Sequence, residues 1–208
     1  MDPGLVGLMI VVGLTGNMAA GKSAVAGLWR QAGVPVVSAD ELAREAVKPG
    51  SPGLDRVESL LGPEALDAEG AMDRAAVRRI VFGDDGLRRG LEAIVHPEVR
   101  RLRDEWTAAQ RAARQGMVVW EIPLLFEAGI TRDVDVVVLV DAPPEVRRRR
   151  AIETRGLSAE EVDAMMAAQM SADLKRQRAD FVIENGGTRE GLAERAGEVL
   201  AGIRSGTV

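Results

Sequence analysis

The sequence of 208 residues contains no cysteine. This absence excludes disulfide bridges, thiolate nucleophiles and cysteine metal sites, and it fits a reducing compartment such as the cytoplasm. The sequence also has no excess of basic charge, because 27 Lys and Arg residues stand against 32 Asp and Glu residues. We therefore expect no broad positive surface for nucleic acid, and an anionic ligand would need a local pocket.

The sequence also lacks an apolar run of the ~18 residues that a membrane span requires. Its apolar start, Leu5 to Leu14, is short, follows Asp2 rather than a basic cluster, and leads directly into a glycine-rich segment. We interpret this start as a buried first strand rather than a signal peptide. The chain is expected in the cytoplasm, with no membrane partner.

Short apolar runs alternate with helical periodicity along the chain. Val and Ile dominate these runs and turn residues bound them, which predicts strands at Met9–Leu14, Val34–Val37, Met117–Ile122, Val134–Val140 and Phe181–Ile183. Their continuous apolarity indicates strands covered on both faces, as in a parallel sheet. The predicted fold is therefore α/β, a doubly wound sheet of about five parallel strands.

Helical signals separate these strands. Ser158 and Glu161 form a capping box, and Pro97 suits the first turn of a long helix that runs towards Arg114. Pro143-Pro144 opens another helix after the fourth strand. The long stretch from Ala39 to Gln115 reads as helical nearly throughout, and we interpret it as a helical insertion beside the sheet.

The strongest motif directly follows the first strand and opens a helix. It fits G-x-x-x-x-G-K-[ST] and reads Gly16-Asn17-Met18-Ala19-Ala20-Gly21-Lys22-Ser23. The glycines let successive backbone N–H groups face inward, where they and the helix dipole hold phosphate oxygens. Lys22 would reach the β- and γ-phosphates and Ser23 would ligate Mg²⁺. Lys22 is one of three lysines in a chain that otherwise uses arginine.

A phosphate loop (P-loop) alone does not distinguish a kinase from a GTPase or a motor. The sequence has no N-K-x-D motif for guanine and no ABC-type signature, and 208 residues leave little room for a motor. A compact kinase of a small molecule remains. The alternatives are a kinase with another acceptor and a regulatory module that binds ATP without transferring phosphate.

Beyond the P-loop, several short stretches resemble the dephospho-CoA kinase family by their order and spacing. The resembling stretches are Val12-Gly13-Leu14-Thr15-Gly16, Ser38-Ala39-Asp40, Ala43-Arg44-Glu45, Leu91-Glu92-Ala93-Ile94-Val95-His96-Pro97, Pro123-Leu124-Leu125-Phe126-Glu127, Arg178-Ala179-Asp180 and Ile183 to Asn185. The resemblance implies ATP, Mg²⁺ and dephospho-CoA as ligands, and a P-loop NTPase-type fold. It also implies one kinase domain, 1–208, with a core of 9–47, 116–143 and 179–208, an acceptor-binding insertion at 48–115 and a lid at 144–178.

Asp40 is the candidate for activating the acceptor hydroxyl. It follows the second strand and so falls at the carboxyl edge of the sheet, where a carboxylate could accept or orient a hydroxyl proton. A helix N-cap is the other interpretation of an aspartate there. The family resemblance favours the catalytic base, although Ser38 stands where the family usually has another Asp.

Three further residues are candidates for substrate binding. Arg44 lies one helical turn after Asp40 and could hold an anionic group, or it could be a surface arginine. His96, the only histidine, matches the acceptor region of the family, the alternative being a residue at a helix start. Glu121 ends the third strand where the family more often has Asp, and it could contact Mg²⁺ through water or bind the acceptor ribose.

The lid contains four consecutive arginines, Arg147 to Arg150. A charge run is usually a solvated surface, and we interpret the four as a group in this way. Arg150 is the exception, because it matches the lid arginine of the family and would neutralise the transferring phosphoryl group. Thr154-Arg155 stands where the family usually has an Arg-Asp pair, so either Arg155 acts from one position along or the lid closes differently. Arg178 is a weaker candidate near the adenine or phosphate edge.

Overall fold

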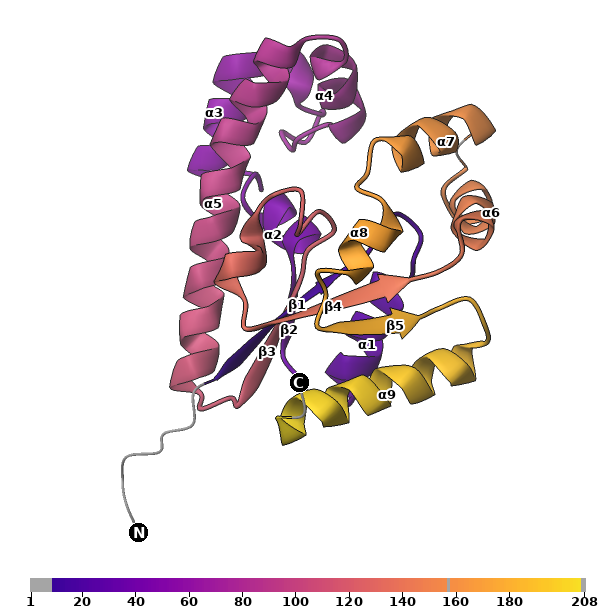
Figure 1. Cartoon of the computed structure of the whole chain (residues 1–208). Helices are drawn as coiled ribbons and strands as arrows, with labels where there is room; N and C mark the ends of the chain where they lie inside the picture. The colour runs from indigo at the N-terminus through magenta and orange to yellow at the C-terminus, as the bar shows by residue number, and fades with distance from the viewer. Residues whose placement is uncertain (1–8, 157, 207–208) are drawn as a thin grey trace. The chain divides into compact units, whose positions relative to one another are not determined.

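The protein is described here by a computed structural model that covers residues 9–156 and 158–206, without the side chain of Arg155 (Figure 1). Two compact units make up the chain. The first unit holds the residues up to 37 and from 110 onward, and the second unit holds residues 38–109.

Five strands form one sheet in the order β2-β3-β1-β4-β5. They are β1 (Ile10–Thr15), β2 (Val36–Ser38), β3 (Met117–Glu121), β4 (Val136–Asp141) and β5 (Phe181–Glu184). β1 pairs in parallel with β3 and β4, and β4 pairs in parallel with β5. All five predicted strands are confirmed, as is the α/β class. β3 and β4 are buried along their whole length, which explains their continuous apolar sequence.

The first unit also contains helices. They are α1 (Lys22–Gln31), the 3₁₀ helix η2 (Ile130–Asp133), α6 (Pro144–Arg155), α7 (Ala159–Ala167), α8 (Ala172–Arg176) and α9 (Arg189–Ser205). Among them, α1, α8 and α9 contact strands of the sheet. α1 and α9 contact each other, and Trp29 Nε1 in α1 donates a hydrogen bond of 2.9 Å to Ala196 O in α9. The predicted capping box at Ser158 and Glu161 is confirmed at the start of α7.

The second unit is helical, as the sequence predicted for this stretch. It contains α2 (Ala39–Glu45), α3 (Pro52–Leu61), the 3₁₀ helix η1 (Pro63–Ala65), α4 (Arg74–Val81) and most of α5 (Asp85–Ala112). Its core is separate from that of the sheet and is centred on Val57, which is fully buried.

The prediction that Pro97 opens a helix is wrong. α5 begins at Asp85, after Asp84 accepts hydrogen bonds from the N–H groups of Gly86 and Leu87, and Pro97 lies inside the helix. A proline there removes one helical hydrogen bond and costs about 3 kcal/mol or more. Burial of apolar side chains on both sides of the proline offsets this cost; they are Leu91, Ile94, Val95, Val99 and Leu102.

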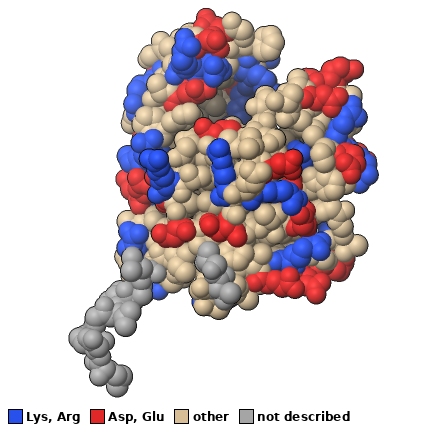
Figure 2. All heavy atoms as spheres, viewed as in Figure 1, with Lys and Arg blue, Asp and Glu red and all other residues tan. Residues whose placement is uncertain are grey.

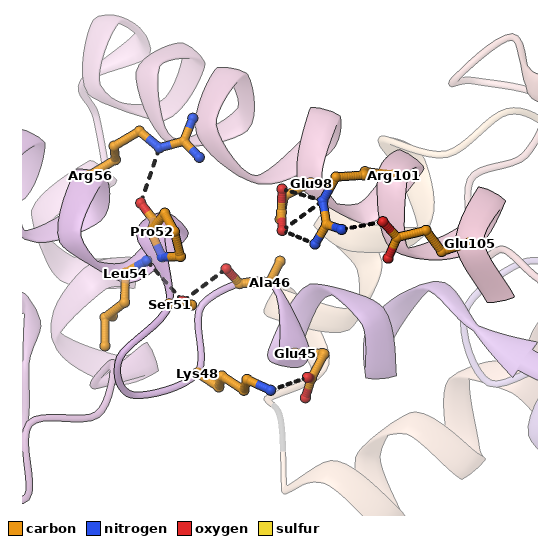
Figure 3. A network of polar contacts seen from close by, with 10 residues as sticks. All are labelled: Glu45, Ala46, Lys48, Ser51, Pro52, Leu54, Arg56, Glu98, Arg101 and Glu105. Carbon is orange, nitrogen blue, oxygen red and sulfur yellow. Dashed lines mark hydrogen bonds and ion pairs between the residues drawn. The ribbon is translucent and has the colours of Figure 1, made fainter.

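Figure 3 shows the polar contacts that join the helix ends and surface of the second unit. Ser51 caps α3 by accepting from Leu54 N, and its hydroxyl donates to Ala46 O at 3.2 Å. On α5, Arg101 pairs with Glu98 and Glu105 at spacings of three and four residues. Such exposed pairs add little to stability, because water and salt screen them. The buried apolar side chains therefore hold this unit together.

Charge is mixed on the face of the molecule that Figure 2 shows, where acidic and basic side chains alternate. Within the described residues, no helix combines the length and the apolarity that crossing a bilayer demands.

Candidate active site

The P-loop lies between β1 and α1, and two glycines shape it. Gly16 has a φ of 156°, and a Cβ there would lie 2.2 Å from Val140 O in β4. Gly21 has a φ of 101°, in the left-handed region, and a Cβ there would lie 2.0 Å from Asn185 Nδ2. Only glycine meets both conditions, so these positions fix the path of the loop into the N-terminus of α1.

Two segments distant in sequence hold the outside of the loop. Asn185, after β5, is buried and donates its Nδ2 to Ala20 O at 2.8 Å. Gln169, in the turn between α7 and α8, accepts from Met18 N with its Oε1 at 2.9 Å. Asn17 Nδ2 donates to Met170 O in the same turn at 3.3 Å. The loop is therefore a supported structure rather than a free surface turn.

The polar side chains at the start of α1 have defined partners. Lys22 Nζ donates to Gly16 O at 2.8 Å, so the ammonium group folds back over the loop. Ser23 Oγ donates to Glu121 Oε1 at 2.7 Å, and Glu121 is 6% exposed at the end of β3. The sequence predicted both Ser23 and Glu121 as site residues, and the structure brings them into contact.

This hydroxyl and carboxylate are hard oxygen donors of the kind that Mg²⁺ prefers. In residues 9–156 and 158–206, no group of three or more acidic or histidine side chains gathers into a metal cage. The pair of Ser23 and Glu121 fits the coordination of Mg²⁺, which is usually held by one or two protein oxygens together with substrate phosphates and water.

The arginines of α6 differ in their surroundings. Arg147 is 5% exposed, and its Nε donates to Ala142 O at 3.0 Å, so interpreting the whole run as solvated surface is wrong for this residue. Burial lowers the pKa of Arg147, and the carboxylates of Asp141 and Glu145 oppose that shift. Arg148 follows the surface interpretation, because it pairs with Asp163 at 2.7 Å and keeps 42% of its side chain exposed.

Arg150, predicted as the lid arginine, is half-buried on α6. Its Nη1 is buried and has no hydrogen-bond partner among the described residues, and the same holds for Oδ1 of Asn17 in the P-loop. Ala151, the next residue of α6, packs with Met18 of the P-loop in one apolar cluster. Buried polar atoms without partners are rare in folded proteins, and bound water or a ligand can complete their bonding.

A cavity of about 580 Å³ adjoins the P-loop in the first unit. Arg176 lines the cavity and forms ion pairs with Asp141 at 2.7 Å and with Glu184 at 2.6 Å. Asn17 and Arg147 also line the cavity. Its volume lies in the range of small-molecule sites, and its lining combines apolar surface with a few charged groups.

Three predicted residues belong to the second unit. Asp40 and Arg44 are exposed on α2, one helical turn apart, and Asp40 is the second residue after the end of β2. His96 is exposed within α5. Back in the first unit, Arg178 is exposed after α8. The side chain of Arg155 lies outside the described residues.

Sequence reasoning missed three residues that shape this site. Gln169 and Asn185 hold the P-loop from outside, and neither has a charge or a motif spacing that marks such a role. Asn185 was visible only as the end of a stretch with family resemblance. Arg147 was hidden in the arginine run, although its position after Pro143-Pro144 put it in the first turns of α6.

Comparisons with known proteins agree on one family. The family model for dephospho-CoA kinase matches residues 10–190. The dephospho-CoA kinase of Anaeromyxobacter dehalogenans strain 2CP-C is 48% identical over 198 residues, which is 95% of this chain and 94% of that protein. The crystal structure of TT1252 from Thermus thermophilus is 43% identical, with a TM-score of 0.81, and covers 93% of this chain and 96% of that one. A dephospho-CoA kinase structure from Campylobacter jejuni is 25% identical, with a TM-score of 0.74, and covers 97% of this chain and all of that one.

Proposed function

Because this chain belongs to the dephospho-CoA kinase family, we propose that its P-loop, α2 and α6 carry the residues for transfer of a phosphoryl group from ATP. The enzyme transfers the γ-phosphoryl group of ATP to the ribose 3′-hydroxyl of dephospho-CoA and releases CoA and ADP. The observation that carries the proposal is the supported P-loop, in a chain that matches its relatives over nearly its full length.

Binding of the ATP phosphates is the role of residues 16–23. The backbone N–H groups of the loop and the N-terminus of α1 provide donors and a positive dipole end for the polyphosphate. Lys22 leaves Gly16 O and turns to the β- and γ-phosphates, where a compact ammonium group acts as a point charge. The nucleoside occupies space beside the loop, with Arg178 at the adenine or phosphate edge.

Mg²⁺ would be held by the Ser23 hydroxyl, with Glu121 beside it. When bound, the ion supplies charge neutralisation for the phosphates. Glu121 accepts a hydrogen bond from Ser23 in this structure, so it also sets the rotamer of the hydroxyl. Glu121 is longer than the Asp that is usual in the family, but it still orients the Ser23 hydroxyl because the two side chains are in direct contact.

Activation of the acceptor is the role of the second unit. Asp40 orients the 3′-hydroxyl for in-line attack and accepts its proton, a contribution worth ~10²–10⁴ in rate. Arg44 lies one turn later on the same helix and binds an anionic group of dephospho-CoA. His96 contacts the acceptor without acting as the base. Residues 48–115 form the acceptor-binding insertion in this proposal.

Charge on the transferring group is neutralised from the lid, residues 144–178. Arg150 has the free bonding capacity for this task, since its buried Nη1 lacks a partner in the described chain. Closure of the lid over the phosphates would expel water that otherwise could accept the phosphoryl group. We place this reaction in the cytoplasm, a reducing compartment that suits a chain without cysteine.

An acceptor panel with ADP readout tests this proposal. Dephospho-CoA should support rapid ADP release, whereas adenosine and AMP should not, because they lack the pantetheine arm that the acceptor region binds. Equal rates with all three acceptors would contradict the substrate assignment. Tight ATP binding without turnover on any acceptor would contradict catalysis itself.

A further inference from the structure

A lysine with no exposed surface lies in α8. Lys175 is 0% exposed, and its Nζ lies 2.8 Å from Glu127 Oε1 in the turn after β3. Glu127 keeps 24% of its side chain exposed. Burying an ammonium group is costly, and a charged pair in the interior seldom adds stability over an apolar pair of the same size. Only the ammonium group is buried, since Glu127 reaches the surface, so the place of Lys175 in the interior needs an explanation besides stability.

The same oxygen of Glu127 has a second partner. Met170 N, in the turn between α7 and α8, donates to Glu127 Oε1 at 3.2 Å. This turn is the one that contacts the P-loop, through Gln169 Oε1 to Met18 N and Met170 O to Asn17 Nδ2. A continuous path of polar contacts thus runs from Lys175 through Glu127 and the turn to the phosphate loop, all within the first unit.

Hydrogen bonds hold the turn that carries Glu127 in place. The turn that carries Glu127 is closed by backbone hydrogen bonds, including Ala128 N to Leu124 O at 2.8 Å. Its first residue, Pro123, accepts a hydrogen bond from Thr15 Oγ1 at the end of β1. The carboxylate therefore sits on a rigid support beside the strand that leads into the P-loop.

We propose that Glu127 and Lys175 are positioning residues for phosphoryl transfer: Glu127 holds the Met170 N–H, Lys175 holds Glu127, and the held turn sets the outer half of the P-loop. The inference rests on the proposed function, since it assigns the pair to the same nucleotide site. The turn lies within the lid, residues 144–178, between α7 and α8, so the pair attaches this part of the lid to the turn after β3. Neither residue touches the substrate.

The experiment compares two double variants that both remove the charges of Lys175 and Glu127. Lys175→Met with Glu127→Gln keeps a side-chain oxygen that can accept from Met170 N. Lys175→Met with Glu127→Leu has no acceptor, and a third variant with Glu127→Ala ensures that the result does not depend on how leucine packs. Lys48→Met with Glu45→Gln, which removes an exposed pair by the same substitutions, is the matched control.

Three quantities are measured for each variant: kcat, the KM values for ATP and dephospho-CoA, and the rate of hydrogen exchange at the Met18 amide. We expect the Leu and Ala doubles to lose between ~10-fold and ~10²-fold in kcat, with a raised KM for ATP, because small displacements of a catalytic loop cost this much. Their KM for dephospho-CoA should stay unchanged and their Met18 amide should exchange faster. The Gln double should lose less kcat than the Leu and Ala doubles, because Gln keeps an acceptor for Met170 N although Lys175 no longer holds it. The control should keep the wild-type KM for ATP and the wild-type Met18 exchange.

Equal kinetics and equal Met18 exchange in the Gln, Leu and Ala doubles would overturn the proposal, because the acceptor oxygen would then have no effect. The exchange measurement needs no turnover. If wild-type protein showed no transfer to dephospho-CoA, the proposed function would fail while Met18 exchange still decided the positioning role.

Discussion

Replacing Gly21 by alanine tests the P-loop geometry with a single methyl group. Gly21 has a φ of 101°, and its missing Cβ would lie 2.0 Å from Asn185 Nδ2, an atom that donates to Ala20 O. The side chain of Asn185 is therefore packed where an alanine would need room. We expect both the fold and the affinity for ATP to suffer.

The magnitude follows from two contributions. A non-glycine residue in the left-handed region costs about 1–2 kcal/mol. Displacing Asn185 breaks a buried hydrogen bond and leaves its partner unsatisfied, which costs about 1–3 kcal/mol. Together the loss of unfolding free energy is about 2–5 kcal/mol. For a chain of this size 1 kcal/mol shifts Tm by about 2–4 °C, so Tm should fall by about 4–20 °C.

Calorimetry with Mg²⁺ and ATP, together with thermal unfolding, measures both effects. Every 1.4 kcal/mol of binding free energy that is lost when the loop amides shift weakens ATP binding about tenfold. We expect the Kd for ATP to rise at least about tenfold. Gly27→Ala is the matched control in the same helix, since a Cβ at Gly27 meets nothing within 4 Å. It should leave ATP affinity unchanged and stabilise the protein by about 0.5–1 kcal/mol.

The reasoning is refuted if Gly21→Ala binds ATP as tightly as wild type and unfolds at the same temperature. The loop would then tolerate a side chain at a position where the structure leaves no space for one.

Four other predictions follow from contacts described above. Lys22→Ala should abolish turnover in the ADP assay, and any substantial residual rate would contradict its role. Asp40→Asn should leave ATP affinity nearly intact by calorimetry and cut kcat by at least ~10², so a retained kcat would reject it as the base. Trp29→Phe should lower the unfolding free energy in urea by ~1 kcal/mol, because it removes the hydrogen bond to Ala196 O while keeping a ring in the core. Burial raises the pKa of Glu127, but hydrogen bonds from Lys175 and the Met170 N–H outweigh burial and hold that pKa below the ordinary 4.5. The ionised carboxylate therefore stabilises the fold above pH 4.5, and this stabilisation is lost as pH falls further. Lys175→Met should reduce the loss of unfolding free energy at acidic pH, measured by urea titration.

The sheet was predictable because strand sequence and burial agree in this fold. Strands covered on both faces must be apolar throughout, and Val136 to Val140 meets that condition without interruption. The P-loop was predictable because its glycines are required by backbone geometry that no other residue accommodates. Both results could be derived from local sequence patterns alone.

The failures depended on tertiary packing. Pro97 is a local signal for a helix start, but apolar residues before and after it pack into one core. This packing keeps α5 continuous across the proline. Burial of Arg147 and the contact of Gln169 with Met18 require knowing which helices meet after folding. Lys175 offered one hint, since lysine is rare in this chain, but its partner lies 48 residues earlier at Glu127.

The hydrogen bond between Trp29 and Ala196 joins residues 167 positions apart. During synthesis on the ribosome, nearly the whole polypeptide must be made before α9 can cover the indole ring of Trp29 in α1. The main apolar core includes residues of α9 as well as β1, so a growing nascent chain exposes part of that core until the last helix emerges. Translation that stalls or terminates before α9 would thus leave α1 without its covering helix and the sheet with an open, aggregation-prone face.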